Sequence, residues 1–475
     1  MRLCDIIKKE EISDSADISF EITDISDNTE KLRPGAVFFA CGSGEKYVIK
    51  AIDAGASAII CDVGANIPPD IPIPVFRVDN ARFSYAVSCQ RLYGSPSKSM
   101  KLVAVTGTNG KTSTAMLVHA ILSRAGRKTG TIGTIGNFIG SERLPASYTT
   151  PPPRELAELL FKMKSAGVKY VAMEASSHAL DQYRLGGLTF DIGIFTNLTR
   201  DHLDYHKTED ACAAAKARLF ENCRHSIINL DDGRAKEMAW HAAGDVYYVS
   251  KNSPRAEFFV DKISCGMKKT DFTLESDYGK LDIRTSLTGD FYVYNVSFAV
   301  AAALLLGVNG EDIISALRDF SPVEGRMETI SQNGVCAVID FAHTPDALKK
   351  TLSSLRRLCV GKLITVFGCG GDRDRGKRPQ MGAVAEKYSD KIIITSDNPR
   401  SERPEDIIDE IASGMSKKSE PVKIPDRAEA IRYALSVAKN GDTVVIAGKG
   451  HEKTMEIQGK KYPYSDLAIL EELDR

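Results

Sequence analysis

Short runs of apolar residues recur along the whole chain, and turns rich in Gly, Pro and Asp separate them. Such runs are typical of buried β-strands. Between many of them lie longer stretches of mixed apolar and polar residues, as in helices packed on a sheet. Strands are predicted at 37–40, 58–61, 75–78, 102–105, 170–173, 192–195, 226–230, 337–340, 363–367, 391–395 and 443–447. Strands that alternate with helices favour an α/β fold with mostly parallel, doubly wound sheets.

Local signals place several helices between these strands. A helix is predicted over 112–124, and Gly126 follows it as a stop signal. Three more helices are expected to begin at prolines, which are favoured in the first turn because an N–H has no helical partner there. These prolines are Pro345, Pro379 and Pro404.

The pattern divides the chain into three blocks. The first, 1–98, ends in a polar segment rich in Gly, Ser and Pro at 94–99, which suits a linker. The second, 99–322, and the third, 323–475, each contain alternating strands and helices. The length of 475 residues agrees with this partition, because roughly 150 residues per domain is usual.

Composition excludes some classes of protein. Apolar residues make up 43% of the chain and charged residues 26%, as in an ordinary globular protein. Lys and Arg number 62 against 63 Asp and Glu, so we expect neither a nonspecific nucleic-acid binder nor a protein held on membranes by bulk charge. This balance still permits a local basic site for a phosphorylated ligand.

Cysteine usage and hydropathy indicate a reducing compartment. The ten cysteines are scattered without C-x-x-C spacing, so neither a zinc ribbon nor a redox motif is indicated. The N-terminus lacks a signal-peptide core, and the longest apolar run, 298–306, is far shorter than the ~20 residues of a membrane span. We therefore expect a cytoplasmic protein with reduced thiols. We also expect it to be a monomer.

A glycine-rich turn joins the predicted strand at 102–105 to the helix after it. Its sequence is Thr106-Gly107-Thr108-Asn109-Gly110-Lys111-Thr112-Ser113. The glycines let backbone N–H groups approach phosphate oxygens, Lys111 can reach the β- and γ-phosphates, and the Thr112 hydroxyl can ligate Mg²⁺. Val105 stands where the usual phosphate-loop pattern has glycine, so this is a variant loop. The alternative is a glycine-rich turn whose lysine binds no phosphate.

Polar residues follow several predicted strands, at the edge where α/β sheets bind ligands. They are Glu174, Asn197, Gly368, Asp397 and Gly448. Glu174 is a candidate Mg²⁺ ligand, since that ion prefers oxygen donors. His202 and His206 have the spacing of a zinc pair, but no Glu follows His202 as in H-E-x-x-H. Capping and core hydrogen bonds are the alternative for each histidine.

Taken together, these motifs resemble the ATP-dependent Mur ligases of peptidoglycan synthesis. The matching segments are 106–112, 174–178, 197–206, 368–379, 397–400 and 448–452. They keep the family's order over almost the whole chain, and the match is weakest in the first block. The resemblance implies a small α/β domain for the uridine end of a substrate, a central P-loop domain for ATP and a Rossmann-like third domain for an amino acid. It also implies amide ligation, in which ATP converts a carboxylate to an acyl phosphate that an amino group attacks.

The resemblance assigns residues to ATP and Mg²⁺. The implied ATP contacts are Gly107, Thr108, Asn109, Gly110, Lys111, Thr112, Ser113, Asn295, Arg326 and Asp340. The implied catalytic residues are Lys111, Glu174, His202 and Lys216, and the implied metal ligands are Thr112, Glu174, His202 and Lys216. In the family this last lysine is carbamylated to N6-carboxylysine, which turns an amine into an anion able to bind a metal. Without the family, Lys216 would be interpreted as a solvated helix lysine.

For a nucleotide-linked peptide, the resemblance implies UDP-N-acetylmuramoyl-L-alanyl-D-glutamate. The residues that match its contacts are Thr29, Tyr148, Thr149, Thr150, Ser176, Gln182 and Arg184. The chain departs from the family at two of these positions. Tyr148 replaces an Asn, and Asp27-Asn28-Thr29-Glu30 replaces the usual Asp-Ser-Arg.

For the incoming amino acid, the resemblance implies meso-diaminopimelate, bound by Arg373, Asp397, Asn398, Pro399, Arg400, Gly448 and Glu452. Arg400 fits the distal carboxylate, which L-lysine lacks, because a guanidinium binds carboxylate bidentately; Glu452 would face the ammonium. The first alternative is L-lysine or another amino acid, since Arg403 stands where the family has Asp. A nucleotide-dependent binding protein without ligation is the second. A turn-capping segment at 397–400 and a basic tract at 373–378 are the plainer interpretations of these residues.

Overall fold

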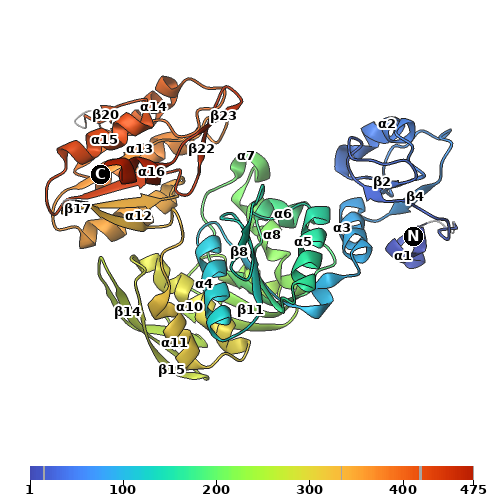
Figure 1. Ribbon diagram of the computed structural model, residues 1–475, viewed down its shortest axis with the longest axis horizontal. Helices are drawn as coiled ribbons and strands as arrows, with labels where there is room; N and C mark the ends of the chain where they lie inside the picture. The colour runs from blue at the N-terminus through green and yellow to red at the C-terminus, as the bar shows by residue number, and fades with distance from the viewer. Residues whose placement is uncertain (14–16, 333, 417–419, 474–475) are drawn as a thin grey trace.

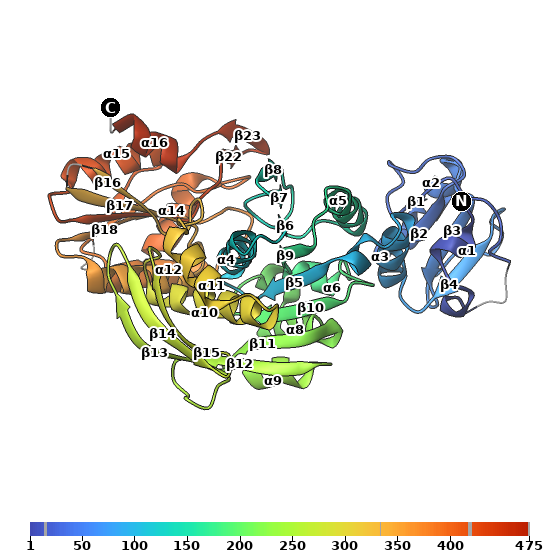
Figure 2. The same cartoon turned by 60° about the horizontal axis from the view of Figure 1, so that its bottom comes forward.

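The computed structural model describes residues 1–13, 17–332, 334–416 and 420–473. Within these ranges, three large sheets and one two-stranded ribbon follow one another along the chain. The first sheet lies at one end of the molecule, the largest in the middle and the third at the other end, so the two termini lie far apart (Figures 1 and 2). The predicted α/β class is confirmed. The boundaries at 98 and 322 stay predictions.

The first sheet has four parallel strands in the order β1-β2-β3-β4. They are β1 (Ile25–Ser26), β2 (Val37–Ala40), β3 (Ala58–Asp62) and β4 (Val75–Val78). Its helices are α1 (Leu3–Ile6), α2 (Val48–Asp53) and α3 (Ala81–Leu92), with 3-10 turns η1 (Lys9–Glu11), η2 (Gly42–Tyr47) and η3 (Pro96–Ser99). Arg154 of the second block donates to both carboxylate oxygens of Asp24, at 2.9 and 3.0 Å, and so ties the two blocks together.

The central sheet has eleven strands in the order β15-β14-β13-β12-β11-β10-β5-β9-β6-β7-β8. They are β5 (Lys101–Thr106), β6 (Thr129–Ile132), β7 (Asn137–Ile139), β8 (Glu142–Leu144), β9 (Tyr170–Glu174), β10 (Phe190–Phe195), β11 (Cys223–Asn229), β12 (Asp245–Ser250), β13 (Phe258–Cys265), β14 (Thr270–Ser276) and β15 (Gly279–Thr285). Its helices are α4 (Lys111–Arg124), α5 (Pro153–Ser165), α6 (Ser177–Asp181), α7 (Leu203–His206), α8 (Glu209–Ala217), α9 (Ala235–Trp240), α10 (Asp290–Leu305) and α11 (Gly310–Asp319), with the 3-10 turn η4 (Phe220–Asn222). The middle of the sheet is parallel, as predicted, and both edges are antiparallel.

The pattern of apolar residues does not predict the antiparallel edges or α10. The apolar run at 298–306 belongs largely to α10, which contacts α4, α11 and the strands β11 to β14. Because the helix has neighbours on almost every side, nearly all its residues are buried and the usual amphipathic spacing is missing. No helix in the described ranges is long and apolar enough to cross a lipid bilayer.

The third sheet has six strands in the order β16-β17-β21-β18-β19-β20, and only β16 runs antiparallel to its neighbour. They are β16 (Glu328–Gln332), β17 (Val335–Asp340), β18 (Leu363–Phe367), β19 (Lys391–Ile394), β20 (Val422–Lys423) and β21 (Thr443–Ala447), beside the ribbon β22 (Thr454–Ile457) and β23 (Lys460–Pro463). Its helices are α12 (Pro345–Leu358), α13 (Lys377–Tyr388), α14 (Pro404–Ala412), α15 (Arg427–Val437) and α16 (Asp466–Leu473). α12 and α14 begin at the predicted prolines, and α13 begins at Lys377, shortly before Pro379.

Candidate active site

The glycine-rich loop lies between β5 and α4, and close neighbours require both of its glycines. Gly107 and Gly110 have φ values of 141° and 90°, which glycine adopts without strain. A Cβ atom at Gly107 would lie 2.0 Å from Thr196 Oγ1, and one at Gly110 would lie 2.5 Å from Asn295 Oδ1. The structure thus brings Asn295, from α10, against the loop that was predicted to bind phosphates.

Lys111, the first residue of α4, folds back over this loop. Its ammonium donates to the carbonyl oxygens of Gly107 at 2.8 Å and Thr108 at 2.9 Å. Burial, assisted by the positive charge of Lys216, lowers the pKa of Lys111 to about 8. The ammonium therefore lies at the loop, where backbone N–H groups and a helix N-terminus favour phosphate.

Glu174, the last residue of β9, is 1% exposed and lies beside Thr112. Its carboxylate accepts hydrogen bonds from Thr112 Oγ1 at 3.0 Å and from the N–H of Thr134 at 2.7 Å. A buried carboxylate and a hydroxyl next to a phosphate loop form an oxygen donor set that suits Mg²⁺. Among the described residues, no group of three or more His, Cys, Asp or Glu side chains is arranged so that it could hold a metal ion by itself.

Lys216 is buried in α8 and only 1% exposed, so the alternative of a solvated helix lysine is wrong. Its amine donates to Cys212 Sγ at 3.5 Å, and no acidic side chain in the described ranges pairs with it. Its positive charge contributes to lowering the pKa values of Lys111 and His202. Lys216 therefore lies in the same part of the molecule as the phosphate loop.

Three histidines and a tyrosine form a cluster near Lys216. The ring centroid of His178 lies 4.8 Å from that of His202, 5.5 Å from that of His206 and 4.3 Å from that of Tyr205. Burial is the main cause that lowers the pKa of His202 to about 3. The ring is therefore neutral at ordinary pH, which is the form that can bind a metal ion.

Residues predicted to bind the nucleotide-linked peptide form a network next to Glu174. The Thr150 hydroxyl donates to the Glu174 carbonyl oxygen at 2.8 Å and accepts from the N–H of Ser176 at 3.1 Å. Arg184 donates to the Thr150 carbonyl oxygen at 2.8 Å and to Gln182 Oε1 at 2.8 and 3.0 Å. The structure thus brings these four predicted residues together at the carboxyl end of β9.

The other predicted peptide contacts lie in different places. The Arg184 guanidinium carbon stands 5.4 Å from the ring centroid of Tyr148, so the residue that departs from the family stacks on the network. Thr149 Oγ1 lies 3.0 Å from Thr134 Oγ1. Thr29 lies in the first block between β1 and β2, and no hydrogen bond in the described ranges joins it to the network.

Sequence reasoning missed Thr134, Asp181 and Tyr205. Gln182 Nε2 donates to the Tyr205 hydroxyl at 3.2 Å, which donates to Asp181 Oδ2 at 2.7 Å. These two hydrogen bonds fix the orientation of the Gln182 amide, so that its oxygen faces Arg184. Tyr205 lies inside the segment 197–206, between two histidines, and this position in the sequence could have indicated a role in the site.

In the third block, Asn398 and Glu452 meet at the carboxyl ends of the strands. Asn398 Nδ2 donates to Glu452 Oε2 at 2.8 Å. The buried ammonium of Lys449 donates to Asn398 Oδ1 at 3.1 Å and to Glu452 Oε2 at 2.7 Å. Gly448 has a φ of 114°, and a Cβ there would lie 2.6 Å from Asp397 Oδ2. Glu452 thus binds the ammonium of Lys449, and its predicted contact with the ammonium of an amino acid stays a prediction.

Arg400 and Arg373 flank the same glycine. Arg400 Nη1 donates to the Gly371 carbonyl oxygen at 2.7 Å, and its Nε lies 3.3 Å from Glu456 Oε2. A Cβ atom at Gly370 would lie 2.9 Å from Arg400 Nη1 and 3.8 Å from Arg373 Cγ. The two arginine side chains predicted for an amino-acid site therefore both lie beside Gly370.

Arg403, which departs from the family, has a largely exposed side chain. Its side chain is 75% exposed and lies 3.9 Å from Glu405. Glu402, just before it, is held by the buried Arg378 at 2.8 Å. In this structure the departure changes charge at the surface.

The second and third blocks meet at the phosphate loop. Arg326 Nη2 donates to Thr112 Oγ1 at 3.2 Å, and Asn109 Nδ2 donates to Asp346 Oδ2 at 3.2 Å. Asp340 is buried, and its carboxylate accepts from backbone N–H groups of its own block at 2.9 and 3.1 Å. The proposed nucleotide contact of Asp340 stays a prediction.

A buried ion pair supports the loops of the third block. The side chains of Arg427 and Asp466 are both 0% exposed, and the guanidinium donates to both carboxylate oxygens at 2.9 Å. Arg427 also donates to the carbonyl oxygens of Ser396 at 3.2 Å and Ala447 at 3.0 Å. It therefore holds the residues that directly precede Asp397 and Gly448.

Replacing Asp466 with asparagine is expected to lower the free energy of unfolding of the third block by about 3–5 kcal/mol, because Arg427 keeps a buried and unpaired charge. Hydrogen exchange of β19 and β21 in urea would measure the loss. The matched control is Glu472→Gln, because Arg432 and Glu472 join the same two helices at 3.6 Å but are 48% and 67% exposed. That change should cost less than about 1 kcal/mol, and equal losses would contradict the role of the buried pair.

Two family models match the chain. The Mur ligase middle domain matches residues 105–303, and the Mur ligase, glutamate ligase domain matches residues 325–450. UDP-N-acetylmuramoyl-L-alanyl-D-glutamate–2,6-diaminopimelate ligase of Aquifex aeolicus is 40% identical over 472 residues, which cover 96% of this chain and 95% of the relative. The protein of the same name from Bacteroides fragilis is 38% identical, with 95% of each chain covered.

Solved structures agree with this assignment. A structure of UDP-N-acetylmuramoyl-L-alanyl-D-glutamate–2,6-diaminopimelate ligase has a TM-score of 0.72 at 32% identity and covers 99% of this chain and 98% of its own. Folylpolyglutamate synthase of Mycobacterium tuberculosis, complexed with ADP and AMPPCP, shares the fold, with a TM-score of 0.67 at 18% identity over 77% of this chain and 92% of its own. The chain belongs to the Mur ligase family of ATP-dependent amide ligases.

Proposed function

We propose that this protein joins meso-diaminopimelate to UDP-N-acetylmuramoyl-L-alanyl-D-glutamate, with ATP converted to ADP and phosphate. The observation that carries the proposal is the pair of hydrogen bonds through which Glu174 links the peptide network to the phosphate loop. Thr150 contacts the backbone of Glu174, and the carboxylate of Glu174 contacts Thr112. A carboxylate held by this network would lie beside the γ-phosphate of ATP. Relatives of similar length that are 38–40% identical carry this activity in their names.

The reaction needs two displacements. First, a carboxylate oxygen attacks the γ-phosphorus of ATP, and the bond to ADP breaks. Then the amine nitrogen of the amino acid attacks the acyl carbon and loses a proton, and phosphate leaves. Phosphorylation is needed because a carboxylate anion repels a nucleophile, whereas its mixed anhydride has a good leaving group. Lys111 would neutralise charge on the phosphoryl group as it moves.

Mg²⁺ would be held by Thr112, Glu174, His202 and the carbamate of Lys216. The ion would neutralise phosphate charge at the loop. The chain's own part is to hold these ligands in place. The N–H of Thr134 fixes the Glu174 carboxylate at 2.7 Å, and burial keeps the ring of His202 neutral.

Each block would bind a different substrate or part of a substrate. Residues 1–98 would bind the uridine end, with Thr29 as a contact, and residues 99–322 would bind ATP and the peptide. Residues 323–475 would bind meso-diaminopimelate, with Arg400 at its distal carboxylate and Glu452 at its ammonium. The contacts from Arg326 to Thr112 and from Asn109 to Asp346 support a site assembled from the second and third blocks.

The decisive experiment measures ADP release with each substrate omitted in turn. Release should require both the UDP-linked dipeptide and meso-diaminopimelate, and L-lysine should replace the latter poorly. Hydrolysis that needs neither the peptide nor the amino acid would instead favour a nucleotide-dependent binding protein. Equal turnover with L-lysine would contradict the selectivity attributed to Arg400.

Replacing Arg400 with alanine is expected to raise the KM for meso-diaminopimelate about 10- to 100-fold, since one hydrogen-bonded charge pair is lost. The KM for ATP should stay the same, because Arg400 lies in the third block away from the phosphate loop. Steady-state kinetics with each substrate varied would measure both constants. Arg403→Ala is the matched control, since its side chain is 75% exposed, and it should leave both values unchanged. A rise in the KM for ATP alone would contradict the assignment.

A further inference from the structure

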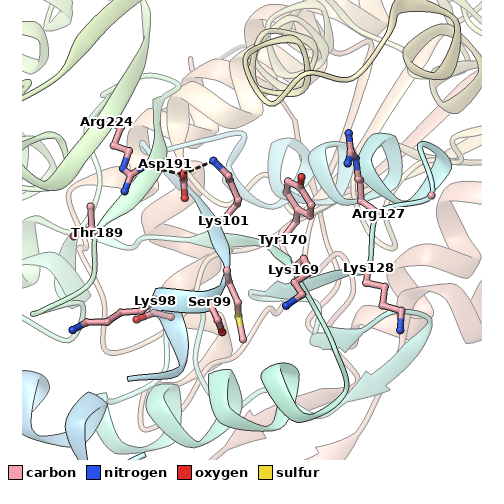
Figure 3. A pocket seen from close by; sticks show the side chains of 13 residues that line it. Lys98, Ser99, Lys101, Arg127, Lys128, Lys169, Tyr170, Thr189, Asp191 and Arg224 are labelled. Carbon is pink, nitrogen blue, oxygen red and sulfur yellow. Dashed lines mark hydrogen bonds and ion pairs between the residues drawn. The ribbon is translucent and has the colours of Figure 1, made fainter. Parts of the chain in front are cut away.

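A pocket lies at the amino ends of the parallel strands of the central sheet, whereas the phosphate loop lies at their carboxyl ends (Figure 3). It has a volume of about 800 Å³ and is formed by η3 and by the amino ends of β5, β9, β10 and β11, with the segment 126–128 before β6. The helix α4 begins at the phosphate loop and ends beside this pocket. Because α4 has 14 residues, it separates the two places by about 20 Å. Nothing in the proposed ligation uses this pocket.

The pocket is strongly basic in a chain whose total charge is close to zero. Its lining contains six basic side chains and one acidic one: Lys98, Lys101, Arg127, Lys128, Lys169, Arg224 and Asp191. The acid engages only two of the cations, since Asp191 lies 3.2 Å from Lys101 Nζ and 3.9 Å from Arg224 Nη1 (dashed lines in Figure 3). Asp191 also accepts a hydrogen bond from the backbone N–H of Leu102 at 3.0 Å, so its carboxylate also holds the start of β5.

Three lysines of the pocket have no partner of their own. In the described ranges, the side chains of Lys98, Lys128 and Lys169 form no ion pair and donate no hydrogen bond. Lys128 and Lys169 precede the neighbouring strands β6 and β9, and the N–H of Lys169 donates to the Lys128 carbonyl oxygen at 2.8 Å. Their backbones are therefore held side by side, directly before two adjacent strands.

Helix capping does not account for these lysines. In a parallel α/β sheet the helix C-termini lie at this edge, and basic residues there are favoured by the helix dipole. Backbone N–H groups already cap the C-termini of the two helices next to these lysines, α4 and α5. The N–H of Arg127 donates to Leu122 O at 3.0 Å after α4, and the N–H of Val168 donates to Met163 O at 3.0 Å after α5. The ammonium groups are thus left available for a ligand.

The remaining lining indicates the class of ligand. Hydroxyl groups of Ser97 and Thr189 stand among the cations and can donate to phosphate oxygens, whereas that of Ser99 donates to the Pro96 carbonyl oxygen at 2.9 Å. The volume is within the range of small-molecule sites. A concave pocket suits a compact solute, whereas a bilayer presents a flat surface. We propose that this pocket is a second binding site, remote from the ligation site, for a compact oligophosphate anion.

The test is calorimetric titration with inorganic tripolyphosphate. Lys111→Ala serves as the background, because it weakens binding of the probe at the phosphate loop. In this background, Lys128→Ala with Lys169→Ala is expected to weaken the remaining binding about tenfold or more. The control, Lys236→Ala with Lys268→Ala, removes two exposed lysines of the same block outside the pocket and should leave the affinity unchanged. Added salt should weaken the binding, since the contacts lie near solvent.

Several results would overturn the proposal. One is the absence of binding in the Lys111→Ala background, and another is equal affinity of the pocket variant and the control variant. Thermal unfolding midpoints check that both double variants fold, and they should match because the four lysines are exposed. A second experiment measures co-sedimentation of the protein with vesicles of phosphatidylglycerol and phosphatidylcholine. Binding to these vesicles that depends on Lys128 and Lys169 would assign the site to lipid headgroups instead of a soluble anion.

Discussion

Replacement of Lys111 by alanine is expected to lower kcat for ligation by about 10²–10³-fold, with a smaller change in the KM for either acceptor substrate. The proposed reaction moves a phosphoryl group that carries several negative charges, and a preorganised cation is worth that much in a buried site. Lys111 is held for this task by the carbonyl oxygens of Gly107 and Thr108 at 2.8 and 2.9 Å. Measurement of ADP release at saturating substrates would give the loss directly.

The pH dependence of the free energy of unfolding distinguishes a loss of catalysis in the Lys111 variant from misfolding. With Lys216 as an ammonium, burial lowers the pKa of Lys111 from 10.5 to about 8, so the folded protein then holds the proton less tightly than the unfolded chain. Between these two pH values the unfolded state binds more protons, and the free energy of unfolding should rise with pH. Lys111→Ala should lose this rise while remaining folded. Lys236→Ala, at an exposed position of the same block, should retain both the rise and full activity. An unchanged kcat in the Lys111 variant would exclude it from the chemistry.

The local pattern of the sequence predicts much of the fold. Strands β2, β4, β18 and β21 have the predicted bounds, because each is a short apolar run between turn residues. The antiparallel strands β13 to β15 escape prediction, because exposed polar residues interrupt their apolar runs. The helix α10 escapes for the opposite reason, since burial on nearly all sides removes its periodicity.

The candidate site divides in the same way. The phosphate loop follows from residue types and spacing, because only glycine fits at Gly107 and Gly110. Glu174 follows from its place after a strand. Asn295 and Lys216 come from the family resemblance alone, since α8 is rich in alanine and nothing local distinguishes a buried lysine there from an exposed one. The Tyr205 contact with Asp181 depends on how two helices approach each other, and no local pattern encodes that distance.

Lys216 is expected to carry a carbamate, and Lys216→Ala is expected to lower kcat by about 10²–10³-fold. The lysine is 1% exposed and has no acidic partner in the described ranges, while its charge lowers the pKa of Lys111. Two ammonium groups buried near each other repel. When the neutral amine nitrogen attacks the carbon of CO₂ and loses a proton, the product is an anion. That anion would stabilise the protonated form of Lys111 and add an oxygen donor near Glu174.

Carbon NMR with ¹³C-labelled CO₂ would detect the carbamate in the wild-type protein, and Lys216→Ala should lack the signal. The control is Lys207→Ala, which removes an exposed lysine close by in the chain. That variant should keep both the signal and the activity, because the Lys207 ammonium, among the residues that the structure describes, donates only to the backbone oxygen of Asp204 at 2.5 Å. Two different results can then be told apart. Loss of activity without any wild-type carbamate signal would mean that the buried amine itself supports Lys111. Full activity without Lys216 would remove the residue from the site, and the metal ligands would then reduce to Thr112, Glu174 and His202.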